Sequence, residues 1–213
     1  SENKMSERQR EILILFSHRK EQDSCLDILQ TSSYLPFRSE LIGIGPREAG
    51  ERTLHLLEKD SNRAVLLLGS AGWIKPSGYP RVPVWANQIV SESGKRIRPT
   101  LRVPAEWIEG QGWATASLVT VSRPVLDEER AEQLRERVQA DMVDMESYAV
   151  LQACASRRVP CGVVRVITDQ ANTQTREDYW HNLVGAMGEL GNEISSLVSW
   201  LHREDRLRLE QED

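Results

Sequence analysis

The residues best placed to do chemistry are two carboxylates that border apolar segments. Asp169 follows a largely apolar run at 163–167, and Glu146 stands at the start of a predicted apolar helix. In open α/β sheets ligands bind beyond the carboxyl ends of the strands, so Asp169 is expected at a ligand-binding edge. Both carboxyl groups are therefore candidates for binding a ligand or transferring a proton.

Each residue also has a purely structural interpretation. A glutamate at the start of a helix, as predicted for Glu146, is stabilised by the positive end of the helix dipole. An aspartate after a strand, as predicted for Asp169, commonly accepts hydrogen bonds in a turn or cap. Taken singly, neither position separates the chemical interpretation from the structural one.

The elements that must position these residues alternate between strands and helices, which favours an α/β fold with a parallel sheet. Apolar runs without polar alternation indicate strands covered on both faces. The expected fold is a single α/β domain with a central, mixed, mainly parallel sheet flanked by helices. Strands are predicted at 12–16, 41–44, 65–68, 114–121 and 161–167, and helices at 47–58, 127–139, 145–157 and from 176 to about 201, with loops and short strands at 73–113.

Two of the predicted helices have a clear apolar stripe. The 127–139 helix should bury Ala131, Leu134 and Val138. The C-terminal helix shows the strongest periodicity in the chain. Its stripe comprises Trp180, Leu183, Val184, Met187, Leu190, Ile194, Leu197, Val198 and Leu201.

Composition excludes several classes of protein. The chain has 213 residues, a net charge of −5 and three cysteines without a Cys-x-x-Cys pair. No apolar run approaches the ~20 residues of a membrane-spanning helix, and the polar N-terminus lacks a signal-peptide pattern. We therefore predict a cytoplasmic protein that binds no nucleic acid and has no membrane span. The predicted organisation is a flexible N-terminus at 1–10, one domain at 11–202 and a charged tail at 203–213.

Familiar cofactor and metal motifs are incomplete. Gly43-x-Gly45 invites a dinucleotide interpretation, but Glu48 stands where the third glycine belongs. A phosphate-binding loop also fails, because Gly50 is followed by Glu51 and Arg52 instead of Lys-Ser/Thr. The four histidines show no metal-ligand spacing. No metal or cofactor is predicted.

Four motifs in consistent order resemble the nucleoside phosphorylase/nucleosidase superfamily, most of all its methylthioadenosine/S-adenosylhomocysteine nucleosidase-like branch. The resemblance runs from about Glu11 to Leu201. The motifs are Gly43-Ile-Gly45-Pro with Ala49, Leu66-Leu-Leu-Gly-Ser-Ala-Gly72, Met145-Glu146 before a helix, and Val159-Pro-Cys-Gly-Val-Val-Arg-Val-Ile-Thr-Asp169.

The resemblance implies cleavage of the bond between ribose C1′ and a purine nitrogen, through an oxocarbenium-like transition state. It assigns Asp169 as the acid that neutralises the leaving base at N7. Glu146 would bind the ribose hydroxyls with Met145 packed on the sugar, and Ser70, Ala71 and Gly72 would line the base or sugar pocket. The water-orienting base matches Glu21, whose alternative is a solvated glutamate in a charged segment.

The resemblance leaves the reaction and the substrate open. Superfamily phosphorylases bind phosphate through a glycine-containing loop after the first strand, whereas residues 17–21 contain no glycine, which favours hydrolysis. Arg19, Lys20 and Arg47 keep phosphorolysis open, and altered pocket segments (83–90 and 120–125) keep a catalytically degenerate nucleoside-binding protein open. The family also implies a homo-oligomer, with a dimer favoured, and a small-molecule nucleoside as the ligand.

Overall fold

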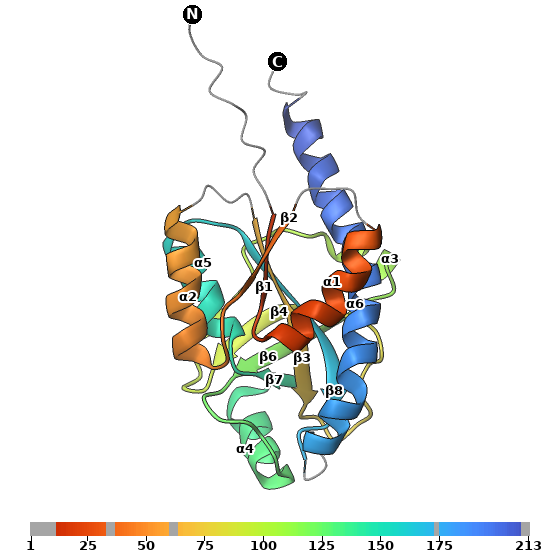
Figure 1. Cartoon of the computed structure of the whole chain (residues 1–213). Coiled ribbons are helices and arrows are strands. Elements are labelled where there is room, and N and C mark those ends of the chain that lie inside the picture. Colours follow the sequence, from red (N-terminus) through yellow and green to blue (C-terminus); the bar gives the residue numbers. More distant parts are fainter. Residues whose placement is uncertain (1–11, 33–36, 60–63, 173–174, 210–213) are drawn as a thin grey trace, which may run out of the picture.

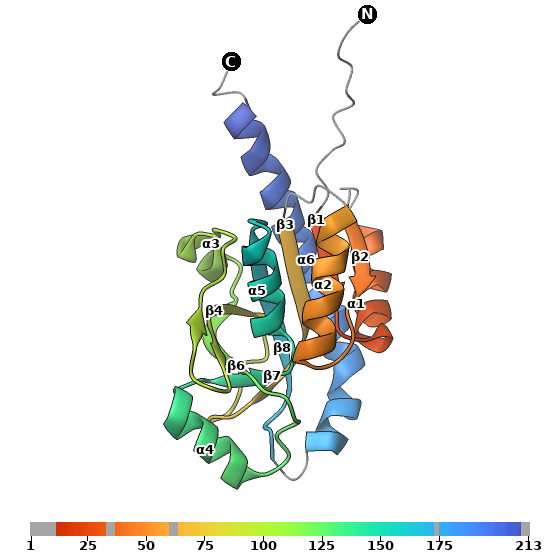
Figure 2. The same ribbon diagram turned by 90° about the vertical axis from the view of Figure 1, so that its left-hand side faces the viewer.

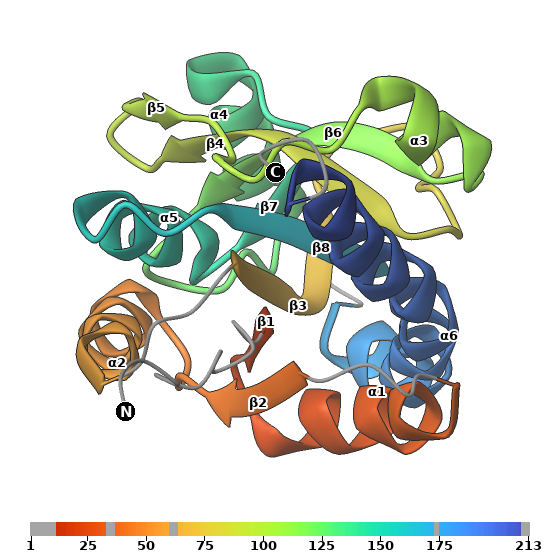
Figure 3. The same ribbon diagram turned by 90° about the horizontal axis from the view of Figure 1, so that it is seen from above.

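A computed structural model describes residues 12–32, 37–59, 64–172 and 175–209. The predicted flexible segment at 1–10 lies outside these residues. Within them, a mixed sheet is covered by helices on both faces, as Figures 1 and 3 show from two directions. The predicted single α/β domain with a mainly parallel sheet is confirmed. No described helix has the length and apolar character needed to cross a membrane.

The strands form one sheet of mixed direction in the order β2-β1-β3-β7-β6-β4-β5, and β8 pairs with both β3 and β4. Five strand pairs are parallel (β1 with β2 and β3, β3 with β8, β6 with β4 and β7), and three are antiparallel. The strands are β1 (Ile12–Phe16), β2 (Phe37–Leu41), β3 (Ala64–Trp73), β4 (Val84–Ser91), β5 (Arg96–Ile97), β6 (Ala114–Thr120), β7 (Met142–Asp144) and β8 (Cys161–Asp169).

Helices cover the sheet in two layers. Helices α2 and α5 lie together on one face and α1 and α6 on the other, while α4 lies at the lower end of the molecule (Figures 1 and 2). The helices are α1 (Arg19–Ser32), α2 (Pro46–Lys59), α3 (Ala105–Gly110), α4 (Glu128–Val138), α5 (Ser147–Ser156) and α6 (Thr175–Leu209). The charged segment after His202 is therefore helical as far as Leu209.

The strongest sequence signals identify real elements. Every residue of β1 and β8 is buried, as expected of strands covered on both faces. In α4, Ala131, Leu134 and Val138 form the buried stripe, and Asp127 caps the helix by accepting a hydrogen bond from the Arg130 amide. Pro46 is the first residue of α2, where a missing amide hydrogen costs nothing.

Other expectations were wrong. The strand predicted at 41–44 lies earlier, at Phe37–Leu41, because Gly43 and Gly45 adopt positive φ angles of 84° and 96° that no strand can hold. The strand predicted at 65–68 is longer than expected, because β3 continues through Gly69 to Trp73. In α6, Trp180 and Val184 are more than half exposed and do not belong to the buried stripe, although the other seven residues do.

Candidate active site

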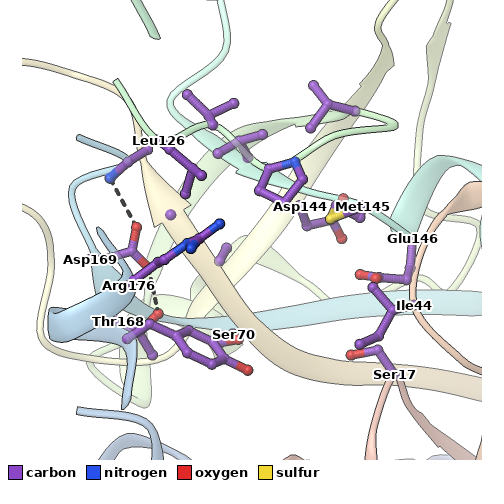
Figure 4. Close-up of a pocket in the computed structure, with 18 of the residues that line it drawn as sticks. Ser17, Ile44, Ser70, Leu126, Asp144, Met145, Glu146, Thr168, Asp169 and Arg176 are labelled. Atoms are coloured by element: carbon purple, nitrogen blue, oxygen red, sulfur yellow. Dashed lines mark hydrogen bonds between the residues drawn. The ribbon is translucent and has the colours of Figure 1, made fainter. Parts of the chain in front are cut away.

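The predicted site residues converge on one cavity of about 280 Å³. Its lining includes all seven candidates, which come from four separated segments of the chain and are shown in part in Figure 4. They are Glu21, Ser70, Ala71, Gly72, Met145, Glu146 and Asp169. The carboxyl end of β3, where three of these residues lie, brings the segments together because it pairs with β7 and β8.

Glu21 is buried in the first turn of α1, so the interpretation as a solvated glutamate is wrong. Its Oε2 accepts a hydrogen bond of 2.7 Å from Ser17 Oγ. Its Oε1 accepts one of 3.0 Å from the Ser70 amide and one of 2.6 Å from Ser70 Oγ. These donors fix the carboxylate against the cavity wall, where it can orient a small polar molecule.

Glu146 is the N-cap residue of α5, but its side chain accepts no capping hydrogen bond from the helix. Its Oε1 accepts a hydrogen bond of 3.2 Å from the Gly45 amide, and its Oε2 lies 3.8 Å from Arg165 Nη2. The amide of Ser147, the first residue of α5, donates instead to Asp144 Oδ2 at 3.1 Å. Asp144 therefore supplies the capping hydrogen bond, while Glu146 keeps the position at the helix N-terminus that its structural interpretation expects.

The ionisation of Glu146 is poised near neutrality. Burial of its carboxyl group and the charge of Asp144 raise its pKa to about 7, and Arg165 opposes this shift. Near pH 7 the residue therefore exchanges between a carboxylate, which only accepts hydrogen bonds, and an acid, which also donates one.

Asp169 is the last residue of β8 and is buried at the far side of the cavity from Glu146 (Figure 4). Its Oδ1 accepts a hydrogen bond of 2.9 Å from the Ala171 amide, and its Oδ2 accepts one of 2.8 Å from Thr168 Oγ1. The turn interpretation thus holds alongside the position in the cavity. Gly72 permits the close packing, since a Cβ atom there would lie 3.0 Å from Asp169 Oδ1.

Arg165 connects Asp144 to Glu146. It is fully buried, forms an ion pair with Asp144 and lies near Glu146. Burial disfavours its charge, but Asp144, Glu146 and Glu21 together raise the pKa of the guanidinium, so it stays cationic. A Cβ atom at Gly69 would lie 2.4 Å from Arg165 Nη1, which explains why β3 has a glycine at this point.

Several lining residues carry no signal in the sequence. His18, Arg176, Tyr179 and Trp180 border the cavity, at the start of α1 and in the first turns of α6. No spacing motif marks them, because they sit on surface-facing turns that only the fold brings to the cavity. The altered segment at 120–125 also contributes, through Val121, Pro124 and Val125.

The charges around the cavity are mostly negative. Four carboxyl-bearing residues line it, namely Glu21, Asp144, Glu146 and Asp169. Arg19, Lys20 and Arg47, which kept phosphate binding open, are not among the described residues that line it. Such a cavity favours a positive charge that develops on a bound molecule, and it disfavours a free phosphate dianion.

Comparison with known proteins agrees with the resemblance in the sequence. Residues 114–198 match the model of the phosphorylase superfamily. No curated protein matches the chain. This match agrees with the resemblance to the nucleoside phosphorylase/nucleosidase superfamily.

Solved structures with the same fold include a 5′-methylthioadenosine/S-adenosylhomocysteine nucleosidase from Helicobacter pylori with butyl-thio-DADMe-Immucillin-A (TM-score 0.81, 19% identity, covering 91% of this chain and 99% of that one). The native futalosine hydrolase of Helicobacter pylori superposes with a TM-score of 0.80 at 19% identity, covering 89% and 97%. The methylthioadenosine/S-adenosylhomocysteine nucleosidase of Neisseria meningitidis, in complex with methylthio-immucillin-A, has a TM-score of 0.75 at 15% identity, covering 89% and 98%.

Proposed function

We propose that the protein is an N-glycosidase that hydrolyses the ribose–base bond of a purine nucleoside of the adenosine type. The observation that carries this proposal is the convergence of Glu21, Glu146 and Asp169 on one cavity. The fold shared with nucleosidases supports it. Each carboxyl group then has a separate task, and the three tasks together complete a hydrolysis.

The leaving base requires a proton. As the bond between C1′ and the purine nitrogen breaks, its electron pair moves onto the base, and Asp169 delivers a proton to N7. Positive charge develops on the ribose at the same time. The neighbouring carboxylates Glu146 and Glu21 stabilise that charge, because they are held in place before the reaction begins.

The sugar and the water require the other two carboxylates. Glu146 accepts hydrogen bonds from the ribose hydroxyls, while Met145 packs beside the sugar. Glu21, fixed by Ser17 and Ser70, orients a water molecule and takes its proton as the oxygen bonds to C1′. The products are the free base and the free sugar.

A panel of purine nucleosides tests the proposal. The purified protein is incubated with adenosine, inosine and 5′-thio-substituted adenosines, with and without phosphate, and free base and sugar are measured. We expect release of base without phosphate. Strict dependence on phosphate would establish a phosphorylase instead. Binding without release from any nucleoside would establish a nucleoside-binding protein.

A further inference from the structure

A polar pair on the cavity wall has no task in the proposed hydrolysis. His18 Nε2 and Tyr179 Oη lie 2.6 Å apart, and both residues line the cavity. The pair joins the start of α1 to the first turns of α6. The His18 side chain is 23% exposed, so its polar atoms are partly withdrawn from water.

The pair adjoins the group proposed to orient water. His18 Nε2 lies 3.8 Å from Glu21 Oε1, the same oxygen that accepts the hydrogen bond from Ser70 Oγ. Burial and the charge of Glu21 raise the pKa of Tyr179, so the phenol keeps its proton. A phenol hydroxyl has one hydrogen to donate and lone pairs to accept, and it can therefore bond to a further hydroxyl group.

The residues that line the cavity with this pair range from buried to exposed. Asp169, at the closed end, is 4% exposed, whereas Ile44 and Trp180, at the rim, are 56% and 58% exposed. Tyr179 contacts Trp180 edge-on, with ring centroids 5.1 Å apart. With the base at Asp169 and the ribose hydroxyls at Glu146, the 5′ carbon would lie toward the exposed lining residues, and Tyr179 contacts one of these, Trp180.

We propose that His18 and Tyr179 form the subsite for the 5′ group and select nucleosides that carry a free 5′-hydroxyl over those with a 5′-thioether. The proposal rests on the proposed function, which supplies the orientation of the nucleoside. A 5′-hydroxyl can exchange hydrogen bonds with the Tyr179 hydroxyl. A thioether sulfur or a methyl group would cover the pair without donating a hydrogen bond to it. It would also displace water that donates such a bond.

Matched substrates test the selection. The intact protein is assayed for release of base from adenosine, 5′-deoxyadenosine, 5′-methylthioadenosine and adenosine 5′-monophosphate. The assay is repeated with the corresponding nucleosides that carry hypoxanthine in place of adenine. We expect kcat/KM for the 5′-hydroxyl nucleoside to exceed that of the 5′-deoxy and 5′-methylthio forms by ~10- to 100-fold. A preference for the thioether would overturn the proposal. So would a preference for the monophosphate, which would assign the rim to an anion near Arg176.

Two variants separate substrate selection from structural support. In Tyr179→Phe the preference for the 5′-hydroxyl over the 5′-deoxy nucleoside should fall to within ~3-fold, because the phenol hydroxyl that would bond to the 5′-hydroxyl is absent. A merely structural role would slow both substrates equally and leave the ratio unchanged, which would overturn the proposal. The control Tyr79→Phe, outside this cavity, should keep the wild-type ratio.

Binding measurements distinguish the two proposals. If no nucleoside releases its base, the proposed hydrolysis fails, and calorimetry with adenosine and 5′-deoxyadenosine then tests the subsite alone. Tighter binding of adenosine by ~10-fold or more, lost in Tyr179→Phe, would support the subsite. Equal affinities, or no binding at all, would overturn it.

Discussion

The floor and the rim of the cavity are built in different ways. The floor residues Glu21, Asp144 and Glu146 are buried, as is Arg165 next to them. Arg165 pairs with Asp144 and lies near Glu146, and Ser70 donates hydrogen bonds to Glu21. At the rim, Ile44 and Trp180 expose more than half of their surface. A buried network allows few substitutions, whereas an exposed rim tolerates many. We infer that the floor determines the reaction and that the adjoining wall, with His18 and Tyr179, determines the substrate.

The largest effect on stability is expected when the guanidinium of Arg165 is removed. Arg165→Met leaves Asp144 and Glu146 as buried carboxylates without a counter-charge. The free energy of unfolding should fall by ~3–5 kcal/mol, measured by urea denaturation. The control Arg157→Met breaks an exposed pair with Glu58 and should cost at most ~1 kcal/mol. Equal stability of the two variants would remove the distinction between buried and exposed pairs.

The next effect concerns rate. Asp169→Asn should lower kcat by ~10²- to 10⁴-fold, because the amide cannot deliver the proton to the leaving base. Its oxygen can still accept the Ala171 amide, so thermal unfolding should change little. Asp127→Asn, which alters the cap of α4 and not the cavity, is the matched control. Wild-type turnover by Asp169→Asn would refute the proposed acid.

A smaller, graded effect is expected from pH. Because burial and Asp144 raise the pKa of Glu146 to about 7, kcat/KM should rise as the pH increases toward 7, approaching ~10-fold per unit well below it. The residual activity of Glu146→Gln should not show this rise of kcat/KM with pH. A wild-type profile that is flat from about pH 5.5 to about pH 8 would contradict the role of the carboxylate in binding ribose.

The same pKa shift affects stability. The native state keeps a proton on Glu146 over the range in which the unfolded chain, with a pKa of 4.5, has lost it. The contribution of Glu146 to the free energy of unfolding is therefore present below pH 4.5 and is lost as the pH rises toward about 7. Urea denaturation of the wild type and Glu146→Gln across this range measures the difference.

The smallest effect is expected at the rim. Ile44→Ala should change the free energy of unfolding by less than ~0.5 kcal/mol, because the side chain is 56% exposed. KM for a nucleoside with a free 5′-hydroxyl should stay within ~3-fold of the wild-type value. A tenfold increase in KM would show that the rim binds the nucleoside as firmly as the floor does.

Sequence patterns predicted the elements that are fully buried or strongly periodic. β1, β8, α2 and α4 follow from apolar runs or stripes. Helix α1 was not predicted. Apart from Glu21, its described buried residues are Cys25 and Leu29, and two apolar positions are too few to form a recognisable stripe in a polar segment. β2 was displaced because its residues are only half-buried, while the apolar run after it contains two turn-forming glycines.

The candidate site divides in the same way. Glu146 and Asp169 lie in contiguous motifs next to buried elements, so the sequence alone pointed to them. Glu21 depended on the resemblance, since its neighbours Lys20 and Gln22 give no sign that it is buried. Tyr179 and His18 are 161 residues apart, and only tertiary packing brings them together. Their roles, and those of all the site residues, are predictions for the experiments above.

The pairing of β8 has a consequence for the order in which the protein can fold. β8 lies between β3 and β4 and pairs Cys161 with Val65, so this part of the sheet closes only after most of the chain has been synthesised. Until then β3 and β4 present unpaired edges, which are prone to association with other chains. Such non-local pairing slows folding. A nascent chain that ends before residue 161 should therefore depend on chaperones and have no enzymatic activity.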